Sequence, residues 1–337
     1  MEPMLSSKSS PIAIMGAGVF GLCTAIHLAE RGYTNVKVLD RQAYQQTQYR
    51  YKDGCDSVSA DINKIIRAAY GSQFGHQTLA LDAIAKWKKW NEEIRSGKCV
   101  SNLISSRRTL SRAWTEWVYG KLNSTCTTAG SVVMFQLPPD EALWNKFAPD
   151  NFPTWSYGRL YGFARGPDGS VKIGYRGTKF TNPQVQPDST VRSVPVTRWT
   201  QHAIHSVPEI ASRTIQKFVR EQLPELIDCA TTTTRLCWYT DSYDNHFVID
   251  VVPQKRGLMV ATGGSGHGFK FLPNLGEHVV DRIEGKTNGF LEYWKWRARD
   301  AGVKPYNSIM EGVESDRSLW RQPLVNLNCA TKQYSGL

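Results

Sequence analysis

Residues 12–40 read IAIMGAGVFGLCTAIHLAERGYTNVKVLD, and this stretch decides the fold of the N-terminal part of the chain. A short apolar run at 12–15 ends in glycine, as a buried parallel strand does. Residues 20–31 then repeat apolar side chains at helical spacing and stop at Gly32, a good C-terminal cap. Residues 36–39 form a second apolar run that Asp40 closes. The pattern predicts one βαβ unit.

Glycines at positions 16, 18 and 21 of this unit follow the spacing Gly-x-Gly-x-x-Gly. Such glycines let the backbone approach a diphosphate, and the helix N-terminus offers it amide donors and positive potential. Asp40 is placed to accept hydrogen bonds from an adenosine ribose. The context favours an adenine dinucleotide, but the motif does not separate FAD from NAD. The predicted cofactor contacts in this unit are Gly16, Ala17, Gly18, Val19, Phe20, Gly21, Asp40 and Arg41.

A second informative stretch, residues 235–273, reads RLCWYTDSYDNHFVIDVVPQKRGLMVATGGSGHGFKFLP. Two apolar, strand-like runs end in a glycine-rich loop at 264–270, ahead of the last predicted helix. Glycines in such a loop permit close backbone approach, and helix-terminal amides can face a developing anion. Lys270 can then place a positive charge beside the pyrimidine edge of a flavin, which becomes anionic on reduction. An NAD-binding domain has no need of this loop.

Together the two stretches resemble the sarcosine oxidase, fructosyl amino acid oxidase (amadoriase) and saccharopine oxidase family of FAD-dependent amine oxidases. The resemblance implies an α/β fold of the glutathione-reductase type, with a Rossmann FAD-binding domain and an antiparallel-sheet substrate domain. It also implies that Cys237 bonds covalently to the 8α carbon of the flavin, whereas a strand cysteine taken alone is usually a small buried hydrophobe. Further implied FAD contacts are Ser59, Lys64, Gly264, Ser265, Gly266, His267, Gly268, Phe269 and Lys270.

The resemblance assigns catalytic roles to three lysines, Lys172, Lys270 and Lys64. Lys172 matches the family lysine that lies by flavin N5 and promotes electron transfer to oxygen, because a nearby cation stabilises superoxide-like charge in an apolar pocket. Spacing alone makes Lys172 an ordinary outward strand residue. Lys64 and Arg67 lie three residues apart on a predicted helix at 60–69, so they would share one face over the flavin.

Arg176 stands about where amadoriases carry an acidic residue that grips the sugar-bearing amine. This departure argues against a fructosyl amine and favours substrates such as saccharopine, pipecolate or N-methyl amino acids, whose carboxylate Arg176 could hold bidentately. Arg176 and Arg67 are the predicted substrate contacts. A second departure is length, because the chain is much shorter than the family between Trp90 and Val132.

The order of elements predicts a discontinuous FAD-binding domain at 1–115 and 231–290, a substrate domain at 116–230 and a C-terminal extension at 291–337. The predicted function is oxidation of the C–N bond of a secondary amine or N-substituted amino acid, in fungal-type amino acid or secondary metabolism, with oxygen reduced to hydrogen peroxide. Two alternatives stay open. The shortened interior is compatible with a non-catalytic binding module. An NAD-linked dehydrogenase needs only the first glycine motif and leaves Cys237 unexplained.

Composition limits the partners. A chain of 337 residues with 41% hydrophobic content can build two domains. Lys and Arg give a net charge of +11 but form no long basic run, so we expect a small amine substrate and oxygen as partners and no nucleic acid. No apolar run predicts a membrane span, and no secretory signal is recognisable. The seven cysteines lack a CxxC pair and predict free thiols in a reducing compartment, with no metal site. We expect a cytoplasmic monomer; the ending Ser335-Gly336-Leu337 only faintly resembles a peroxisomal signal.

Overall fold

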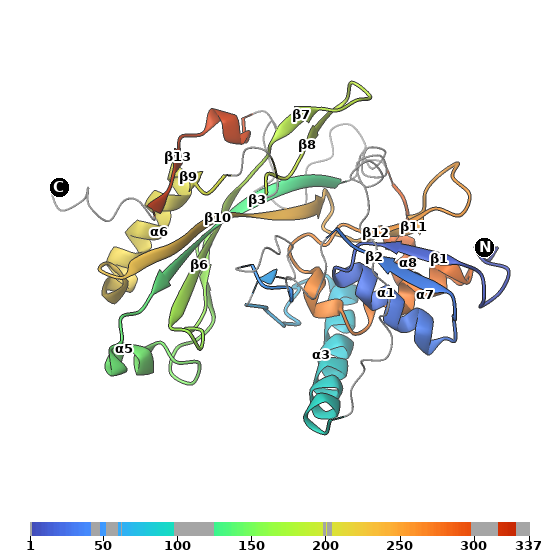
Figure 1. Cartoon of the computed structure of the whole chain (residues 1–337), viewed down its shortest axis with the longest axis horizontal. Helices are drawn as coiled ribbons and strands as arrows, with labels where there is room; N and C mark the ends of the chain where they lie inside the picture. The colour runs from blue at the N-terminus through green and yellow to red at the C-terminus, as the bar shows by residue number, and fades with distance from the viewer. Residues whose placement is uncertain are drawn as a thin grey trace. The chain divides into compact units, whose positions relative to one another are not determined.

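A computed structural model describes residues 2–41, 48–51, 60–61, 63–97, 125–197, 200, 204–297 and 316–327. The chain divides into two compact units, and each is described by itself. Unit 1 comprises Met1–Cys126 with Thr240–Val303, and unit 2 comprises Thr127–Tyr239 with Lys304–Leu337. Figure 1 labels most of the helices and strands of both units.

Unit 1 begins with the βαβ unit that the sequence predicts. Strands β1 (Ile12–Met15) and β2 (Val36–Leu39) pair in parallel, with Ile12 opposite Val36, and helix α1 (Val19–Glu30) connects them. A Cβ atom on Gly21 would lie 1.8 Å from the carbonyl oxygen of Gly16, so only glycine lets the first turn of α1 sit this close to the preceding loop. The predicted βαβ unit is confirmed.

The rest of unit 1 packs its elements around this start. They are α3 (Phe74–Arg95), the antiparallel pair β11 (Val248–Val251) and β12 (Met259–Thr262), the short helix η4 (Gly268–Phe271), α7 (Leu275–Ile283) and α8 (Gly289–Trp294). Helices α1 and α7 lie against each other, and a Cβ atom on Gly276 would approach the Cys23 carbonyl oxygen to 2.2 Å. The buried core contains Leu28, Phe247, Phe271 and Trp294.

One predicted helix of unit 1 is wrong. Residues 63–70 have no helical structure, although the sequence predicts a helix over 60–69. The carbonyl oxygen of Arg67 accepts a hydrogen bond from Lys270 Nζ at 3.2 Å instead of an amide four residues ahead. Ile65 and Ile66 are exposed rather than turned into a core. A contact with a distant part of the chain therefore overrides the local helical pattern.

Unit 2 is built on a five-stranded sheet of order β10-β3-β6-β5-β4. Its strands are β3 (Thr125–Gln136), β4 (Trp155–Tyr157), β5 (Leu160–Gly162), β6 (Ser170–Phe180) and β10 (Ala230–Ser242), and the pairs β3–β6, β5–β6 and β4–β5 are antiparallel. Strands β3 and β10 each run a short way into unit 1. The antiparallel sheet expected in this part of the chain is confirmed.

Shorter elements complete unit 2. They are α5 (Glu141–Lys146), the hairpin of β7 (Pro183–Val185) and β8 (Val191–Ser193), the pair β9 (Val207–Pro208) and β13 (Leu324–Val325), α6 (Glu209–Gln222), η3 (Pro224–Leu226) and η6 (Leu319–Arg321). Residues 316–327 thus join unit 2 through β13. Helix α6 covers one face of the sheet (Figure 1).

The two faces of this sheet carry different side chains. Val133 of β3, Ile173 and Tyr175 of β6 and Leu236 of β10 belong to a buried apolar cluster that includes Ala211, Ile215 and Val219 of α6. Successive side chains of a strand point to opposite faces. The neighbouring residues of these strands, among them Lys172 and Cys237, therefore point away from α6. We call this the α6-distal face.

An irregularity in β6 changes what the α6-distal face presents. Ser131 pairs with Tyr175 and Ala129 pairs with Phe180, so residue 130 alone stands opposite residues 176–179. Tyr175 and Phe180 both lie in the α6 cluster. At this point β6 therefore contains three more residues than β3. The core residues keep their pairing on both sides of the irregularity, and additional side chains reach the α6-distal face.

Candidate functional site

The glycine turn between β1 and α1 has the geometry of a phosphate-binding turn. Gly16 adopts a φ of 104°, and its amide donates to the Leu39 carbonyl at 2.7 Å, which ties the turn to the end of β2. The Ala17 amide donates to Asp40 Oδ2 at 2.5 Å, so this carboxylate lies beside the turn. A Cβ atom on Gly18 would meet nothing within 4 Å, so the backbone is open there. Open backbone and the unbonded first amides of α1 fit a dinucleotide diphosphate.

The glycine-rich loop at 264–270 contacts the first glycine motif through the Phe20 side chain. Ser265 and Gly266 have φ angles of 45° and 73°, and the Ser265 amide donates to Thr240 at 3.0 Å. Added Cβ atoms on Gly264 and Gly268 would lie 3.5 and 3.6 Å from the Phe20 ring. The structure therefore brings the two glycine motifs together at Phe20, within unit 1.

Lys270 lies in a buried setting next to this loop. Its Nζ donates to the Arg67 carbonyl at 3.2 Å and to the Tyr70 hydroxyl at 3.0 Å, and Trp87 Nε1 donates to the Lys270 carbonyl at 2.8 Å. Lys64 Nζ lies 4.7 Å from the Phe269 ring centroid and donates to the Asp61 carbonyl. Lys64 and Lys270 thus belong to one basic neighbourhood, but without the helical face that the sequence predicts.

Sequence reasoning missed a column of rings beside Lys270. His76 stacks between Tyr70 and His246, with centroid distances of 5.3 and 5.1 Å. His267 joins them, because its Nδ1 lies 2.9 Å from the Tyr70 hydroxyl and its Nε2 lies 3.1 Å from the Asn245 carbonyl. Burial, with smaller effects of His246 and Lys270, lowers the pKa of His76 to about 4. Burial also raises the pKa of Tyr70. Both rings are therefore neutral at neutral pH.

In unit 2, three residues that the sequence singles out share the α6-distal face. Lys172 is 3% exposed, and its Nζ lies 5.3 Å from the Phe163 ring centroid. The Arg176 guanidinium carbon lies 5.9 Å from the Tyr161 ring centroid. Cys237 is 5% exposed and hydrogen-bonds the side chain of Tyr239. Strand pairing therefore brings Lys172, Arg176 and Cys237 to one surface of the sheet.

Two tyrosines cover this surface, and sequence reasoning missed both. A Cβ atom on Gly174 would lie 2.1 Å from the Tyr161 ring, and one on Gly130 would lie 3.2 Å from the Tyr239 ring. Each ring thus lies over a glycine within a strand. A glycine inside a predicted strand is the sequence feature that could have indicated a ring packed closely against it. Burial, with Cys237 and Tyr161 acting in the same direction, raises the pKa of the Tyr239 hydroxyl. The result is an apolar, aromatic surface with cations at its border.

One predicted contact residue lies outside the described part of the chain, and two others are exposed. Ser59 lies outside the described residues. Arg41 and Arg67 are exposed, and the Arg67 contact with Lys270 is made by its backbone. Among the residues described, no group of three or more His, Cys, Asp or Glu side chains could hold a metal ion. No helix among them is long and apolar enough to cross a membrane.

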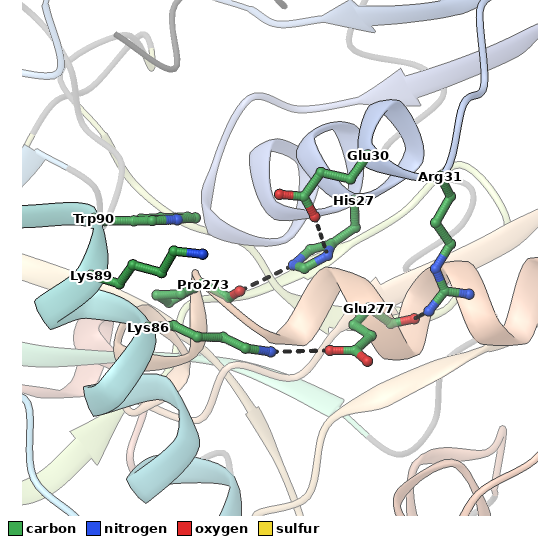
Figure 2. Close-up of a pocket in the computed structure, with 8 residues that line it drawn as sticks. All are labelled: His27, Glu30, Arg31, Lys86, Lys89, Trp90, Pro273 and Glu277. Atoms are coloured by element: carbon green, nitrogen blue, oxygen red, sulfur yellow. Dashed lines mark hydrogen bonds and ion pairs between the residues drawn. The ribbon is translucent and has the colours of Figure 1, made fainter. Parts of the chain in front are cut away.

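A separate pocket of about 300 Å³ lies at the far end of α1 from the glycine turn (Figure 2). Several of its polar side chains pair with one another: Lys86 Nζ lies 3.1 Å from Glu277, and His27 Nδ1 lies 3.0 Å from Glu30. None of the predicted cofactor contacts lines it. The lining residues are His27, Glu30, Arg31, Lys86, Lys89, Trp90, Pro273 and Glu277. We assign it no part in the candidate site.

Comparison with known sequences gives local matches to amine-oxidising enzymes. The chain is 41% identical to an L-saccharopine oxidase of Schizosaccharomyces pombe over 96 residues, which is 28% of this chain and 22% of the relative. It is 44% identical to an N-methyl-L-tryptophan oxidase of Salmonella typhi over 73 residues, which is 22% of this chain and 19% of the relative. The matched stretches span about a fifth of the length of these curated relatives.

Comparison with solved structures covers nearly the whole chain. A fructosyl peptide oxidase from E. terrenum superposes with a TM-score of 0.74 and 18% identity, over 95% of this chain and 98% of that one. A fructosamine oxidase from Aspergillus fumigatus (Amadoriase II) gives 0.67 and 22% identity, over 87% and 90%. These neighbours confirm the predicted fold class, an α/β architecture with an antiparallel sheet.

Membership of a family follows from a longer sequence match. The model of the FAD dependent oxidoreductase family matches residues 11–101 and 113–282, well over half of the chain. The match includes both glycine motifs, Lys172, Arg176 and Cys237. It supports FAD as the cofactor, in agreement with the fit of the glycine turn. The chain belongs to the FAD-dependent oxidoreductase family.

Proposed function

We propose that this protein uses FAD to oxidise the C–N bond of a secondary amine or N-substituted amino acid, with oxygen as the electron acceptor. The observation that carries the proposal is the α6-distal face of unit 2, where Lys172, Arg176 and Cys237 border an aromatic surface. Two curated relatives named as oxidases of saccharopine and N-methyl-tryptophan support the same class of reaction.

Unit 1 is proposed as the FAD-binding domain and unit 2 as the substrate domain. The amides at the start of α1 would bind the diphosphate, and Asp40 would accept hydrogen bonds from the ribose. FAD, when bound, would accept a hydride equivalent from the carbon next to nitrogen and pass the electrons to oxygen. Lys270, held by Tyr70, would supply positive charge, as would Lys64.

Cys237 is proposed as the site of a covalent bond to the flavin. Forming the thioether would replace the S–H bond of Cys237 and one C–H bond of the 8α methyl group with an S–C bond. The two electrons and two protons released would reduce one oxygen molecule to hydrogen peroxide. Burial of Cys237 beside Tyr239 keeps the thiol dry and oriented by a hydrogen bond.

Lys172 is proposed to hold positive charge where oxygen is reduced, because a buried cation stabilises the developing negative charge. Arg176 is proposed to bind a substrate carboxylate, which a guanidinium can hold through two hydrogen bonds, and Arg67 is proposed as a further substrate contact. A small amine or amino acid and oxygen are the proposed partners of a monomeric, cytoplasmic enzyme.

The test is a peroxide assay on purified protein with visible flavin absorbance. We expect turnover of secondary amines that carry a carboxylate, drawn from sarcosine, pipecolate and saccharopine, and weak or no turnover of fructosyl amino acids. A yellow protein that oxidises none of them would favour a binding module without catalysis. A colourless protein that reduces a nicotinamide cofactor would contradict the proposal in favour of a dehydrogenase.

A further inference from the structure

Lys270 is attached to the segment before α3 through two oxygen atoms. Its Nζ donates to the Arg67 carbonyl at 3.2 Å and to the Tyr70 hydroxyl at 3.0 Å. Both oxygens are neutral, because burial raises the pKa of Tyr70 and its hydroxyl keeps the proton at neutral pH. These two contacts therefore orient the Lys270 ammonium without cancelling its charge.

The hydrogen bonds continue from Tyr70 to the glycine-rich loop at 264–270. The Tyr70 hydroxyl lies 2.9 Å from His267 Nδ1, and His267 Nε2 lies 3.1 Å from the Asn245 carbonyl. The four groups form a series that starts at the Lys270 ammonium and ends at the Asn245 carbonyl. We call it the Lys270–Asn245 series.

The two ends of this series impose one direction on its protons. An ammonium group can only donate, and a carbonyl oxygen can only accept. The Tyr70 oxygen therefore accepts from Lys270, and its single proton is donated to His267 Nδ1. A ring nitrogen that accepts carries no proton, so neutral His267 has its proton on Nε2, where it is donated to Asn245. Each side chain in the series thus has one possible role.

Packing holds the Tyr70 ring in place within the series. The ring stacks on His76 at a centroid distance of 5.3 Å and meets His267 edge-on at 5.7 Å. Lys270 Nζ lies 4.6 Å from the centroid of the same ring. A phenol packed in this way has little freedom to turn its hydroxyl away, so the position of the Lys270 ammonium depends on Tyr70.

We propose that Tyr70 is a positioning residue for the cofactor: through the series with His267, it holds the Lys270 ammonium at the edge of the flavin that becomes negatively charged on reduction. The inference rests on the proposed function for the place of Lys270 beside FAD. It goes beyond that function in assigning Tyr70 and the proton direction of His267. A cation already held in place stabilises the developing negative charge without reorganisation, so Tyr70 raises the reduction potential of the flavin.

The experiment measures the two-electron reduction potential of the flavin in the full, flavin-loaded protein, by equilibration with a reference dye. Tyr70→Phe keeps the ring and removes the hydroxyl. It should lower the equilibrium constant for reduction about tenfold, which makes the potential about 30 mV more negative. Tyr33→Phe is the matched control and should keep the parent potential, because Tyr33 is also buried in unit 1 but its hydroxyl donates to Glu284 at 3.4 Å. An unchanged or more positive potential in Tyr70→Phe would overturn the inference.

Two substitutions of His267 test the direction of the series. The side-chain amide of asparagine can replace Nδ1 as the acceptor of the Tyr70 proton, whereas that of glutamine replaces only Nε2. His267→Gln should therefore lower the potential about as much as Tyr70→Phe, and His267→Asn should lower it less. If Tyr70→Phe does not fold, this pair decides the matter, and equal potentials in the two variants would refute the series.

Nitrogen NMR of the imidazole rings gives a readout that does not depend on the flavin potential. The His267 signals are assigned in the parent by their loss in His267→Asn. We expect the His267 proton on Nε2 in the parent, and a shift of the Nδ1 signal toward that of an unbonded nitrogen in Tyr70→Phe. A parent protein with the proton on Nδ1 would contradict the direction of the series.

Lys270→Met separates this inference from the proposed function. A parent potential in Lys270→Met would overturn both the proposed place of Lys270 beside FAD and the role of Tyr70. A lowered potential in Lys270→Met, with the parent value in Tyr70→Phe, would keep Lys270 beside the flavin and eliminate Tyr70 alone. None of these measurements requires turnover, so they test the series even if no amine is oxidised.

Discussion

His76 stacks on His246 with ring centroids 5.1 Å apart and planes inclined by 13°. His76 Nε2 and His246 Nδ1 are buried without a hydrogen-bond partner among the described residues. A proton added to His76 would bring a second positive charge close to the buried Lys270 ammonium. The stack is therefore stable only while both imidazoles are neutral, and this makes the stability of unit 1 depend on pH.

The stability of the protein should fall between about pH 6.5 and pH 4. The ordinary pKa of histidine is 6.5, and burial holds the pKa of His76 at about 4 in the folded protein. In this window the unfolded chain binds a proton that the folded chain excludes, so acid favours unfolding. The contribution is complete above about pH 6.5 and is lost as the pH falls, by up to about 3 kcal/mol. Burial lowers the pKa of His246 in the same direction.

Melting temperatures measured across this range would check the effect. His76→Phe keeps an aromatic ring in the stack and removes the titrating group, so its melting temperature should change less with pH. His205→Gln, at an exposed position, is the control and should follow the parent. An unchanged pH slope in His76→Phe would show that His76 does not cause the acid sensitivity.

Cys237→Ala should yield a protein that binds FAD but loses it on acid precipitation. The parent pellet should stay yellow after washing, and the peptide that contains Cys237 should carry the added mass of one flavin. Cys229→Ala is the control, because Cys229 is also buried in unit 2 but contacts the Glu225 carbonyl at 3.3 Å and has no predicted flavin role. A colourless pellet from a yellow parent protein would mean that FAD is bound without the thioether.

Lys172→Met should leave the flavin attached and slow reoxidation of the reduced flavin by oxygen. We expect a decrease of about a hundredfold, the usual cost of removing one preorganised charge-stabilising group. Stopped-flow mixing of reduced protein with oxygenated buffer measures the rate directly. Lys146→Met, at an exposed position paired with Glu225, should react at the parent rate. Equal rates in Lys172→Met and the parent would remove Lys172 from the oxygen reaction.

Gly174→Ala should displace the Tyr161 ring, because the new Cβ would lie 2.1 Å from its present position. Overpacking of this kind costs about 1–3 kcal/mol of stability, and the displaced ring should also weaken substrate binding. Denaturant unfolding and the KM of the oxidised amine measure the two effects. Gly289→Ala is the control, since its Cβ would meet nothing within 4 Å. A Gly174→Ala protein as stable and active as the parent would show that Tyr161 moves without cost.

Local sequence patterns predicted best the part of unit 1 whose structure depends on contacts between neighbouring residues. Residues 12–40 contain their own strand period, helix period and glycine turn, and the structure follows them closely. The predicted helix at 60–69 is wrong because its backbone bonds to Lys270, about two hundred residues later in the chain. No local pattern contains that contact. His76 and His246 were missed for the same reason, since their stacking depends on the packing of α3 against the segment between β10 and β11.

In unit 2 the sequence identified individual residues but not their arrangement. Lys172 and Cys237 were singled out by resemblance, and alternation along each strand could give only their local direction. Their common face depends on the strand order β10-β3-β6-β5 and on the pairing register. Lys179, whose Nζ lies 4.5 Å from the Tyr239 ring centroid, could not have been placed on this face, because a regular alternation from Lys172 puts position 179 on the α6 side. The irregularity reverses that direction, and the sequence of residues 176–179 alone does not predict it.

The irregularity in β6 also has an evolutionary consequence. Tyr175 and Phe180 each keep their place against β3, so the excursion between them can gain or lose residues without disturbing the hydrophobic side of the sheet. An insertion or deletion there would exchange the charged groups offered to a ligand in a single genetic event. The length and charge of this sheet face can therefore change inside a strand while the apolar face keeps its packing against α6.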